Sequence, residues 1–389
     1  MRHWISAILV GLLRITTVAA QQNPFQVAGQ LFADREGRLD YVAPLRALAI
    51  NQPSFDSDVY RQALATYNSF VGKLSPTAPT KSATPYALAE VGPLLARRAR
   101  ATSVVLINEA HNQPAHRAYC RQLLMRLAPL GYSILAVEAL STAEININER
   151  KFPVSASGFY TREPNMANLL RAACESGFYV FSHEQTAVQN KKFTDSGRAD
   201  NYRDSMQAVN ILAMLRRNPK AKIVALVGYD HVLEKKRNGL KRMATYLREL
   251  GHLDPFTIDQ TETYQPQLSG PATQPMALIA RDGTLTTIGD RKGYVDMQII
   301  HPVVTLVQGR PRWLVEGSSA VLFVRQIPPT KVGHFWLVQL YDQKEYRQYG
   351  EKAIPLDQYL TGPKEKQVQL VGFKPGRAVI TKYRAADLL

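Results

Sequence analysis

Carboxylate and imidazole side chains follow each of four short apolar runs in the middle of the sequence. The runs cover residues 103–107, 133–137, 178–182 and 222–228. The side chains that follow them are Glu109 and His111, then Glu138, then His183 and Glu184, and finally Asp230 and His231. If the runs are parallel strands, their carboxyl ends meet at the edge where open α/β sheets bind ligands. We therefore predict that these side chains converge on one crevice.

Such a cluster supports two kinds of chemistry. Glutamate and histidine can activate water directly, as general base and general acid. They can also hold a divalent metal ion that lowers the pKa of a bound water molecule. Glu109 and His111, with one residue between them, suit either mechanism. The predicted catalytic residues are Glu109, His111, Glu138, Arg203 and His231; the predicted metal ligands are His111, Glu138 and His231; the predicted cofactor-binding residues are His116, His183 and Glu184.

Arg203 stands on a polar stripe of a helix that we predict over residues 199–217. Gln207 and Asn210 share this stripe at i+4 and i+7. A polar stripe is typical of a solvent-exposed helix face. The alternative is that Arg203 reaches over the crevice and pairs with an anionic ligand or with a site carboxylate. In that position it would stabilise developing negative charge.

The composition excludes several classes of protein. The chain has 389 residues, of which 45% are apolar and 21% charged, and these are values of a globular protein. Two cysteines, Cys120 and Cys174, are too few for a disulfide framework or a four-thiolate zinc site, although they could pair with each other. The serine elbow G-x-S-x-G, the phosphate loop GxxxxGK[ST], the dinucleotide motif GxGxxG and the zinc motif HExxH are all absent.

The organisation of the chain predicts an α/β fold with a β-rich C-terminal module. Residues 21–85 are expected to form a helical segment and a linker rich in Pro, Ser and Thr. Residues 86–263 alternate apolar runs with amphipathic runs, which predicts a mostly parallel sheet flanked by helices. Residues 276–389 form the predicted module, with strands expected at 276–280, 295–300, 321–326, 335–341, 367–372 and 378–383.

Residues 1–20 have the pattern of a secretory signal peptide. A basic start at Arg2 precedes an apolar run from Trp4 to Leu13, and small residues precede Gln21. We therefore predict a secreted or periplasmic protein. No later run reaches about 18 apolar residues, so no transmembrane segment is expected.

The net charge of +16 favours contact with polyanions. The densest basic runs, at residues 97–100 and 235–242, are expected to be solvated helix faces, because they lack the interleaved aromatic residues of nucleic-acid binding surfaces. We predict a small-molecule or peptide substrate and no specific nucleic acid. The composition sets no oligomeric state.

Three segments resemble a known superfamily. Residues 107–116 (INEAHNQPAH) are similar to the signature G-E-x-H-(D/N)-x-P-x-x-H of the ChaN-like haem-binding proteins, whose superfamily includes the erythromycin esterases and the TraB/Tiki proteins. Residues 203–210 (RDSMQAVN) resemble the R-D-x-x-M-A-x-N helix of the esterase branch. Residues 228–231 (GYDH) resemble the late G-x-x-H, and Glu138 matches the family's lone strand-end glutamate.

The resemblance implies a pocket built from Glu109, His111, Glu138 and His231. In the esterase branch the matching residues activate water for hydrolysis, the Tiki branch is described as metal-dependent peptidases, and the ChaN-like branch binds haem. The sequence departs from the pattern at Asn108, where the family has Gly, and at Gln207, where Ala is common. We predict an exported hydrolase of an ester, lactone or amide, with a haem- or metal-binding protein as the alternative and a divalent metal or haem as the cofactors to test.

Overall fold

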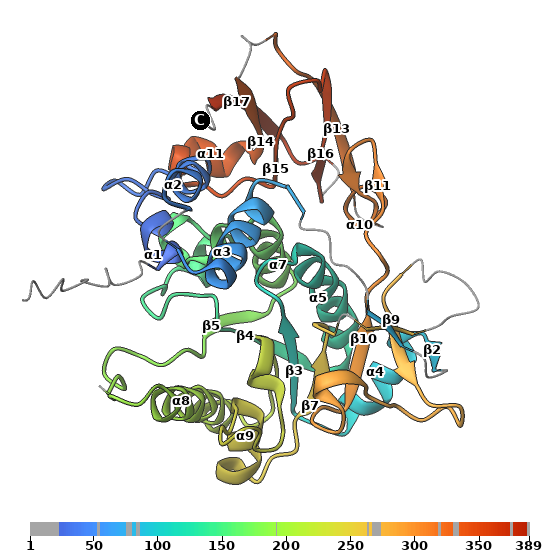
Figure 1. Ribbon diagram of the computed structural model, residues 1–389. Coiled ribbons are helices and arrows are strands. Elements are labelled where there is room, and N and C mark those ends of the chain that lie inside the picture. Colours follow the sequence, from blue (N-terminus) through green and yellow to red (C-terminus); the bar gives the residue numbers. More distant parts are fainter. Residues whose placement is uncertain are drawn as a thin grey trace, which may run out of the picture.

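A computed structural model shows an α/β fold built on one large sheet (Figure 1). It describes residues 23–52, 55–74, 80–82, 86–191, 193–262, 264–266, 274–317, 320–329, 334–373 and 376–386. In spatial order the eight strands of the sheet are β2 (Ala87–Ala89), β9 (Met276–Ile279), β10 (Met297–Ile300), β7 (Phe256–Asp259), β3 (Val104–Glu109), β6 (Lys222–Gly228), β4 (Tyr132–Val137) and β5 (Tyr179–Ser182). From β10 to β5 all neighbouring strands are parallel. The strand β9 is antiparallel to both of its neighbours, β10 and β2.

Helices cover both faces of this sheet. One face carries α4 (Val91–Arg100), α5 (Pro114–Leu127) and α7 (Pro164–Glu175), and the other carries α8 (Ser196–Arg217) and α9 (Met243–Gly251). Alternate residues of β3 enter the two cores, with Val105 and Ile107 on the first face and Val104 and Leu106 on the second. Because successive side chains of a strand point to opposite faces, an unbroken apolar run marks a strand covered on both sides.

Local sequence signals explain where the helices begin. Pro114 and Pro164 occupy the first turn of α5 and α7, where a missing backbone N–H costs nothing. The Glu163 carboxylate caps α7 by accepting hydrogen bonds from the backbone N–H groups of Asn165 and Met166. The predicted α/β class and the four predicted strands are confirmed, while α8 begins at Ser196, three residues before its predicted start.

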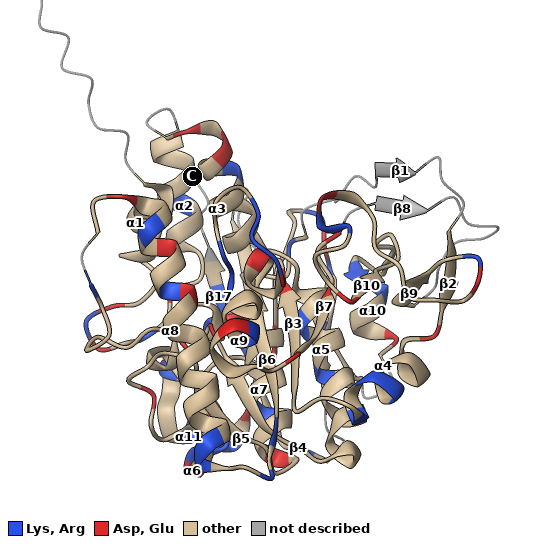
Figure 2. Cartoon of the chain, turned by 90° about the horizontal axis from the view of Figure 1, so that it is seen from below, with Lys and Arg blue, Asp and Glu red and all other residues tan. Residues whose placement is uncertain are grey.

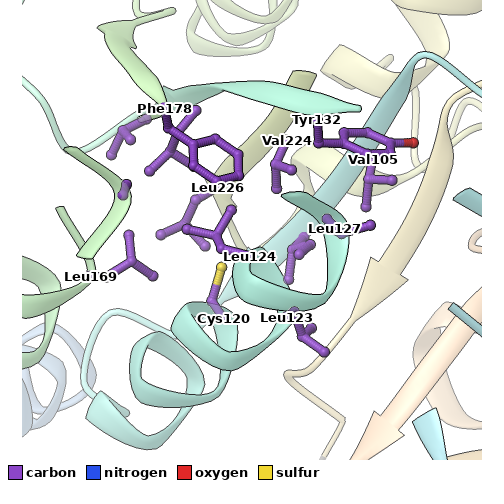
Figure 3. Close-up of a cluster of buried hydrophobic side chains, with 14 of the residues drawn as sticks. Val105, Cys120, Leu123, Leu124, Leu127, Tyr132, Leu169, Phe178, Val224 and Leu226 are labelled. Carbon is purple, nitrogen blue, oxygen red and sulfur yellow. The ribbon is translucent and has the colours of Figure 1, made fainter. Parts of the chain in front are cut away.

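The face covered by α5 and α7 contains both cysteines. Cys120 lies among Leu123, Leu124 and Leu169 in a tightly packed apolar cluster (Figure 3). Both Cys120 and Cys174 are buried and free, so the pairing that the sequence left open is not formed. Burial raises the pKa of the Cys174 thiol to about 11, which keeps it protonated at neutral pH.

The N-terminal helices pack against the C-terminal part of the chain. These helices are α1 (Pro24–Gly29), α2 (Ala43–Asn51) and α3 (Ser57–Phe70). Phe32 and Phe70 share one apolar core with Leu337, Ile354 and Leu360, which come from the C-terminal part. That part contains the sheets β13 (Val321–Gln326) with β16 (Gln367–Gly372), and β15 (Asp357–Leu360) with β14 (Phe335–Asp342) and β17 (Val379–Ala386), together with α11 (Gln343–Tyr349).

Short elements complete the described chain. They are α6 (Ile147–Arg150), α10 (Arg312–Val315), the strand pairs β1 (Thr80–Ser82) with β8 (Tyr264–Pro266) and β11 (Leu306–Val307) with β12 (Arg310–Pro311), and the 3-10 turns η2 (Ala128–Leu130), η3 (Ser155–Ser157), η4 (Tyr160–Arg162), η5 (Tyr229–Val232), η6 (Gly289–Arg291) and η7 (Gly350–Lys352). No helix within the described ranges has the length and apolar character needed to cross a membrane.

The structure corrects one part of the predicted division. The strands expected at 276–280 and 295–300 were assigned to the C-terminal module, but β9 and β10 belong to the central sheet. Their composition resembles that of the later strands, and only their pairing with β2 and β7 reveals their place. The predicted signal peptide, residues 1–20, lies outside the described residues, as does most of the predicted linker rich in Pro, Ser and Thr. Export therefore stays a prediction.

Candidate functional site

A cavity of about 360 Å³ opens at the carboxyl ends of β3, β4 and β6. Four of the five predicted catalytic residues line it, namely Glu109, His111, Glu138 and Arg203. The rest of its wall consists of Ala139, Leu140, Ser141, Gly158, Phe159, Tyr160, Met166, Leu226, Val227 and Gly228. His231 contacts Glu138 and Arg203 next to the cavity. The side chains do meet at one edge of the sheet, while their catalytic roles remain predictions.

Glu109 and His111 form a carboxylate–imidazole pair. Nδ1 of His111 lies 2.7 Å from Oε1 of Glu109, which is the last residue of β3. This contact fixes the orientation of the ring and directs Nε2 away from the carboxylate. The Nε2 edge packs against Gly228, where an added Cβ would meet the ring carbon Cε1 at 2.7 Å. Glycine at position 228 therefore gives the ring the space that it occupies.

A buried arginine, Arg117 of α5, holds Glu109 in place. Its guanidinium Nε donates to Oε2 of Glu109 at 2.7 Å and its NH2 donates to Oε1 at 3.1 Å. NH2 also donates to the carbonyl oxygen of His111 at 2.9 Å, and NH1 donates to Glu163 at 3.1 Å. Burial would raise the pKa of Glu109, but the charge of Arg117 and the contact with His111 lower it to about 2. Glu109 is therefore ionised at neutral pH, and both of its oxygens are occupied.

Sequence analysis missed Arg117, although the sequence carries a signal for it. Arg117 shares the stripe of Cys120, Leu124 and Leu127, at spacings of three, seven and ten residues, and all four are buried. A charge on the apolar stripe of a helix must find partners within the core. The partners of Arg117 are Glu109, which is a predicted catalytic residue, and Glu163, to which the sequence analysis assigns no role.

Two aromatic rings flank His111. Tyr160 of η4 stacks on the imidazole, with ring centroids 4.3 Å apart, and Tyr229 meets it edge-on at 5.1 Å. Gly158 allows the Tyr160 loop to approach the end of β4, because a Cβ there would lie 2.1 Å from the carbonyl oxygen of Ala139. Tyr229 has φ of +24°, a backbone conformation that costs roughly 1–3 kcal/mol in a non-glycine residue. The donor Nδ2 of Asn108 holds the carbonyl oxygen of Tyr229 at 2.8 Å.

Asn108 is one of the positions where the sequence departs from the family pattern. Its side chain is fully buried, and Nδ2 also donates to Asp259 at 2.6 Å. Its Oδ1 accepts from the backbone N–H of Gln260 at 2.7 Å. Asn108 thus connects β3 to the strand ends on its two sides.

Glu138, directly after β4, holds two cavity residues together. Its Oε2 accepts from the backbone N–H of Gly228 at 2.6 Å, and its Oε1 accepts from NH2 of Arg203 at 2.7 Å. Burial opposes the charge of Glu138, but the positive groups of His231 and Arg203 hold its pKa well below the usual range. Glu138 is therefore a fixed negative charge beside the cavity.

His231 and Asp204 form a second carboxylate–imidazole pair. Nδ1 of His231 lies 2.6 Å from Oδ1 of Asp204, and Nε2 lies 3.6 Å from Oε1 of Glu138. Burial alone would lower the pKa of His231, but the charges of Glu138 and Asp204 raise it above the ordinary value. Asp204 also accepts from the backbone N–H of Met243 at 2.7 Å, at the start of α9. The sequence showed Asp204 within the helix motif but gave it no role.

Arg203 reaches over the crevice, which is the second of the two alternatives that the sequence left open for this residue. Its guanidinium joins Glu138 to Glu184, donating to Glu184 through Nε at 3.0 Å. NH1 lies 3.3 Å from Nε2 of His231. Gln207, one helical turn later, donates to the same Glu184 at 3.1 Å. The stripe of α8 therefore faces the site.

The three predicted cofactor-binding residues do not line the cavity. His116 is buried, and its Nδ1 accepts from the backbone N–H of Ala110 at 3.1 Å. His183 is fully buried, and neither of its ring nitrogens has a hydrogen-bond partner among the described residues. Burial lowers the pKa of both histidines to about 4, so both are neutral at pH 7. Glu184 binds Arg203, as described above.

The side chains as arranged do not fit a metal ion. No three His, Cys, Asp or Glu side chains in the described part of the chain are placed to hold one. The guanidinium of Arg203 contacts both Glu138 and His231, which are two of the predicted ligands. A metal ion at the same place would be repelled by this positive charge. Metal binding by His111, Glu138 and His231 stays an untested prediction.

Comparison with known proteins finds solved structures of weak similarity to part of this chain. No family model and no curated protein matches the sequence. The type III effector HopBA1 is 13% identical, with a TM-score of 0.34 over 56% of this chain and 96% of its own. ChaN of Campylobacter jejuni, described with cofacial haem binding, is 10% identical, with a TM-score of 0.35 over 58% of this chain and 99% of its own. RRSP, a MARTX toxin effector domain from Vibrio vulnificus CMCP6, is 16% identical, with a TM-score of 0.33 over 54% of this chain and 47% of its own.

At these scores the likenesses carry no argument about family or activity. The superfamily resemblance of the three motifs therefore remains a prediction, and the function has to be argued from the geometry of the cavity.

Proposed function

We propose that this protein is a hydrolase of esters, lactones or amides in which His111 activates water. The observation that carries the proposal is the pair of carboxylate–imidazole contacts, Glu109–His111 and Asp204–His231, with Arg203 and Glu138 between them. A base, an acid and a fixed positive charge at one cavity are the groups that acyl transfer to water requires.

His111 is the general base of this mechanism. In the neutral ring, the hydrogen bond to Glu109 selects the tautomer with the proton on Nδ1, which leaves the lone pair of Nε2 free to take a proton. Glu109 itself is a poor base because its pKa is about 2 and Arg117 occupies its oxygens. As water attacks the carbonyl carbon, Nε2 takes its proton and later returns it to the leaving group. Glu109 and Arg117 thus position the base, in the way that a buried aspartate positions the histidine of a serine-protease triad.

Arg203 and His231 stabilise the negative charge that develops on the carbonyl oxygen. Arg203 is a cation at the cavity, with a raised pKa, and the pKa of His231 is held above its ordinary value, which favours its charged form. Removing one such donor typically costs roughly 100- to 1,000-fold in kcat. Glu138 and Glu184 fix the guanidinium in place before the substrate arrives.

The charge balance of the site favours neutral or cationic substrates. Its carboxylates are those of Glu109, Glu138, Glu163, Glu184 and Asp204, and its guanidinium groups are those of Arg117, Arg203 and Arg242. Even with His231 protonated, negative groups are in excess, and this excess repels anionic substrates such as phosphate esters. Leu140, Phe159 and Met166 supply an apolar wall for the acyl side.

The test is a hydrolysis screen of the purified protein against esters, lactones and peptides, with and without Mn²⁺ or Zn²⁺. Each reaction is run beside two variants, His111→Asn and His252→Asn. His252 is an exposed residue in a left-handed backbone conformation that asparagine tolerates, so its variant is the matched control. Turnover that is lost with His111→Asn and kept with His252→Asn supports the proposal. Equal turnover in all three proteins contradicts it.

Haem binding is the second candidate, because one observation favours it. An imidazole whose Nδ1 is held by a carboxylate, with its other nitrogen beside a cavity, is the arrangement of many metal-ligating histidines. His111 would then be the residue that holds the haem iron. Titration with haemin distinguishes the two functions, since haem binding shifts the Soret band in the native protein and in His252→Asn but not in His111→Asn.

A further inference from the structure

The edge of the sheet opposite the cavity carries unpaired positive charge. The segments that enter β3, β4, β5, β6 and β7 all lie at this edge, since these strands are parallel and their carboxyl ends form the cavity. Exposed basic residues gather there from three helix ends. They are Arg97 and Arg100 of α4, Arg126 of α5, Arg216 and Arg217 of α8, and Lys220, and we call these six residues the basic edge. Figure 2 shows the basic turns of α4 in blue.

Contacts between the elements show that these ends are neighbours. Nζ of Lys222, the first residue of β6, donates to the carbonyl oxygens of Ala99 and Arg100 at 3.0 and 3.1 Å. The start of β6 therefore touches the end of α4, with Lys220 two residues before it. Arg126 lies over the other end of α4, because a Cβ at Gly92 would come within 2.5 Å of its NH1.

The basic edge has no carboxylate partners within the described residues. The acidic residues near this edge pair with other cations, and Asp296 contacts Arg98 of α4 at 3.3 Å. Glu175 contacts Arg377 at 3.3 Å, Glu249 contacts Lys241 at 2.7 Å, and Asp254 contacts Arg248 at 3.2 Å. Positive residues at helix C-termini complement the helix dipoles, which explains a cation at each end taken singly. The dipoles do not explain six cations without a balancing carboxylate.

Exposed apolar side chains lie at the same edge. They are Met125 beside Arg126, Tyr179 at the start of β5 and Leu250 at the end of α9, and they are 39%, 52% and 53% exposed. Met125 reaches the turn before β5, where its sulfur accepts from Oγ of Ser176 at 3.3 Å. Aliphatic side chains such as Met125 and Leu250 cannot stack on nucleobases in the way that aromatic rings do. They can enter the acyl boundary of a bilayer, and a tyrosine suits the headgroup layer.

We propose that this edge docks on an anionic lipid surface. The six cations of the basic edge attract the headgroups, and Met125, Tyr179 and Leu250 enter the interface between them. Because the cavity opens at the other end of the strands, it faces away from the lipid and stays accessible. This surface is independent of the proposed hydrolase, so either inference can fail without the other.

The test is sedimentation of the full chain with vesicles of phosphatidylcholine, alone or mixed with phosphatidylserine. A fourfold charge reversal, Arg97→Glu, Arg100→Glu, Arg216→Glu and Arg217→Glu, removes most of the basic edge. The matched control is Lys344→Glu, Arg347→Glu, Lys364→Glu and Lys366→Glu, four exposed residues of the C-terminal part with the same change in net charge. Circular dichroism establishes that both variants are folded.

We expect the native protein and the control to sediment with phosphatidylserine vesicles and to dissociate as salt is added. The edge variant should lose at least 100-fold in partition coefficient, since each basic residue near an anionic bilayer contributes about fivefold. A second variant, Met125→Ser with Leu250→Ser, should weaken binding and leave the salt dependence unchanged. Equal binding by the edge variant and the control overturns the proposal, because net charge alone would then be responsible. Binding to RNA or heparin without binding to vesicles overturns it as well.

Discussion

Oδ1 of Asp204 lies 2.6 Å from Nδ1 of His231, while Arg203, the preceding residue of α8, contacts Nε2 at the opposite edge of the same ring. Two consecutive helix residues thus hold one imidazole from both sides. The carboxylate favours the charged ring, and the guanidinium disfavours it. Glu138 decides the balance, because it adds a second negative charge, and the pKa of His231 is raised.

This relationship predicts how Asp204 controls the pH dependence of turnover. The mechanism requires His231 in its charged form, so activity falls as pH rises through the pKa of His231. Asp204→Asn removes one of the charges that raise this pKa and should move the alkaline limb of the kcat/KM profile to lower pH. Asp200→Asn, an exposed residue of the same helix, should leave the profile unchanged. An NMR titration of His231 measures the shift directly, and an unshifted titration in Asp204→Asn would refute the assignment.

The same variant should cost some stability. Asp204 accepts from the backbone N–H of Met243 at the start of α9. Asparagine keeps one oxygen that accepts from this N–H, but its NH2 group replaces Oδ2, which accepts from NH1 of Arg242 at 3.2 Å, and an NH2 group cannot accept. Loss of a hydrogen bond to a charged group typically costs roughly 1.5–3 kcal/mol in the free energy of unfolding, which urea denaturation can measure.

Gly228→Ala should reduce activity far more than stability. The new methyl group would meet the ring of His111 at 2.7 Å and force it away from its position against Glu109. A displacement of about 1 Å in a catalytic group can cost about 100-fold in rate. The control is Gly197→Ala in α8, where the nearest atom would lie at 3.4 Å and the helix gains from alanine. If Gly228→Ala and Gly197→Ala turn over alike, the position of the His111 ring is not critical.

Arg203→Lys should lower kcat by roughly 100-fold or more and change KM little. A lysine ammonium is a single point of charge and cannot bridge Glu138 and Glu184 as the planar guanidinium does. Arg198→Lys, at an exposed position of the same helix, provides the comparison. A rise in KM with unchanged kcat would show instead that Arg203 binds the substrate without stabilising the transition state.

His183 should make the protein less stable in mild acid. Burial lowers its pKa in the folded state to about 4, while the unfolded chain keeps the ordinary value of 6.5. The unfolded state therefore binds the proton more readily, and stability is lost as pH falls from 6.5 towards 4. By linkage this histidine alone contributes about 2 kcal/mol of the loss between pH 7 and pH 5.

His183→Leu should remove this part of the pH dependence. Both ring nitrogens lack partners among the described residues, so the substitution forfeits no hydrogen bond there. Urea denaturation at pH 7 and at pH 5 measures the difference. A variant that loses as much stability between the two pH values as the native protein would show that His183 does not carry the effect.

Local patterns in the sequence determined the frame of the site. Apolar runs predicted β3, β4, β5 and β6, because a strand covered on both faces must be apolar throughout. Prolines mark the first turns of two of the helices that cover these strands, α5 and α7. Since parallel strands present their carboxyl ends at one edge, the positions of Glu109 and Glu138 in the chain already implied that they lie close together.

Only the tertiary structure decided which groups pair with which. Arg117 and Glu163 lie 46 residues apart in the sequence, and Asp204 and His231 lie 27 residues apart. Neither the helical nor the strand periodicity of a sequence connects positions so far from each other. The place of β9 and β10 in the central sheet depends likewise on pairing with distant strands. The sequence by itself determined which residues could do chemistry and at which edge they lie. Folding decided their charge states and roles, because these depend on burial and on the partners that long-range contacts bring to each group.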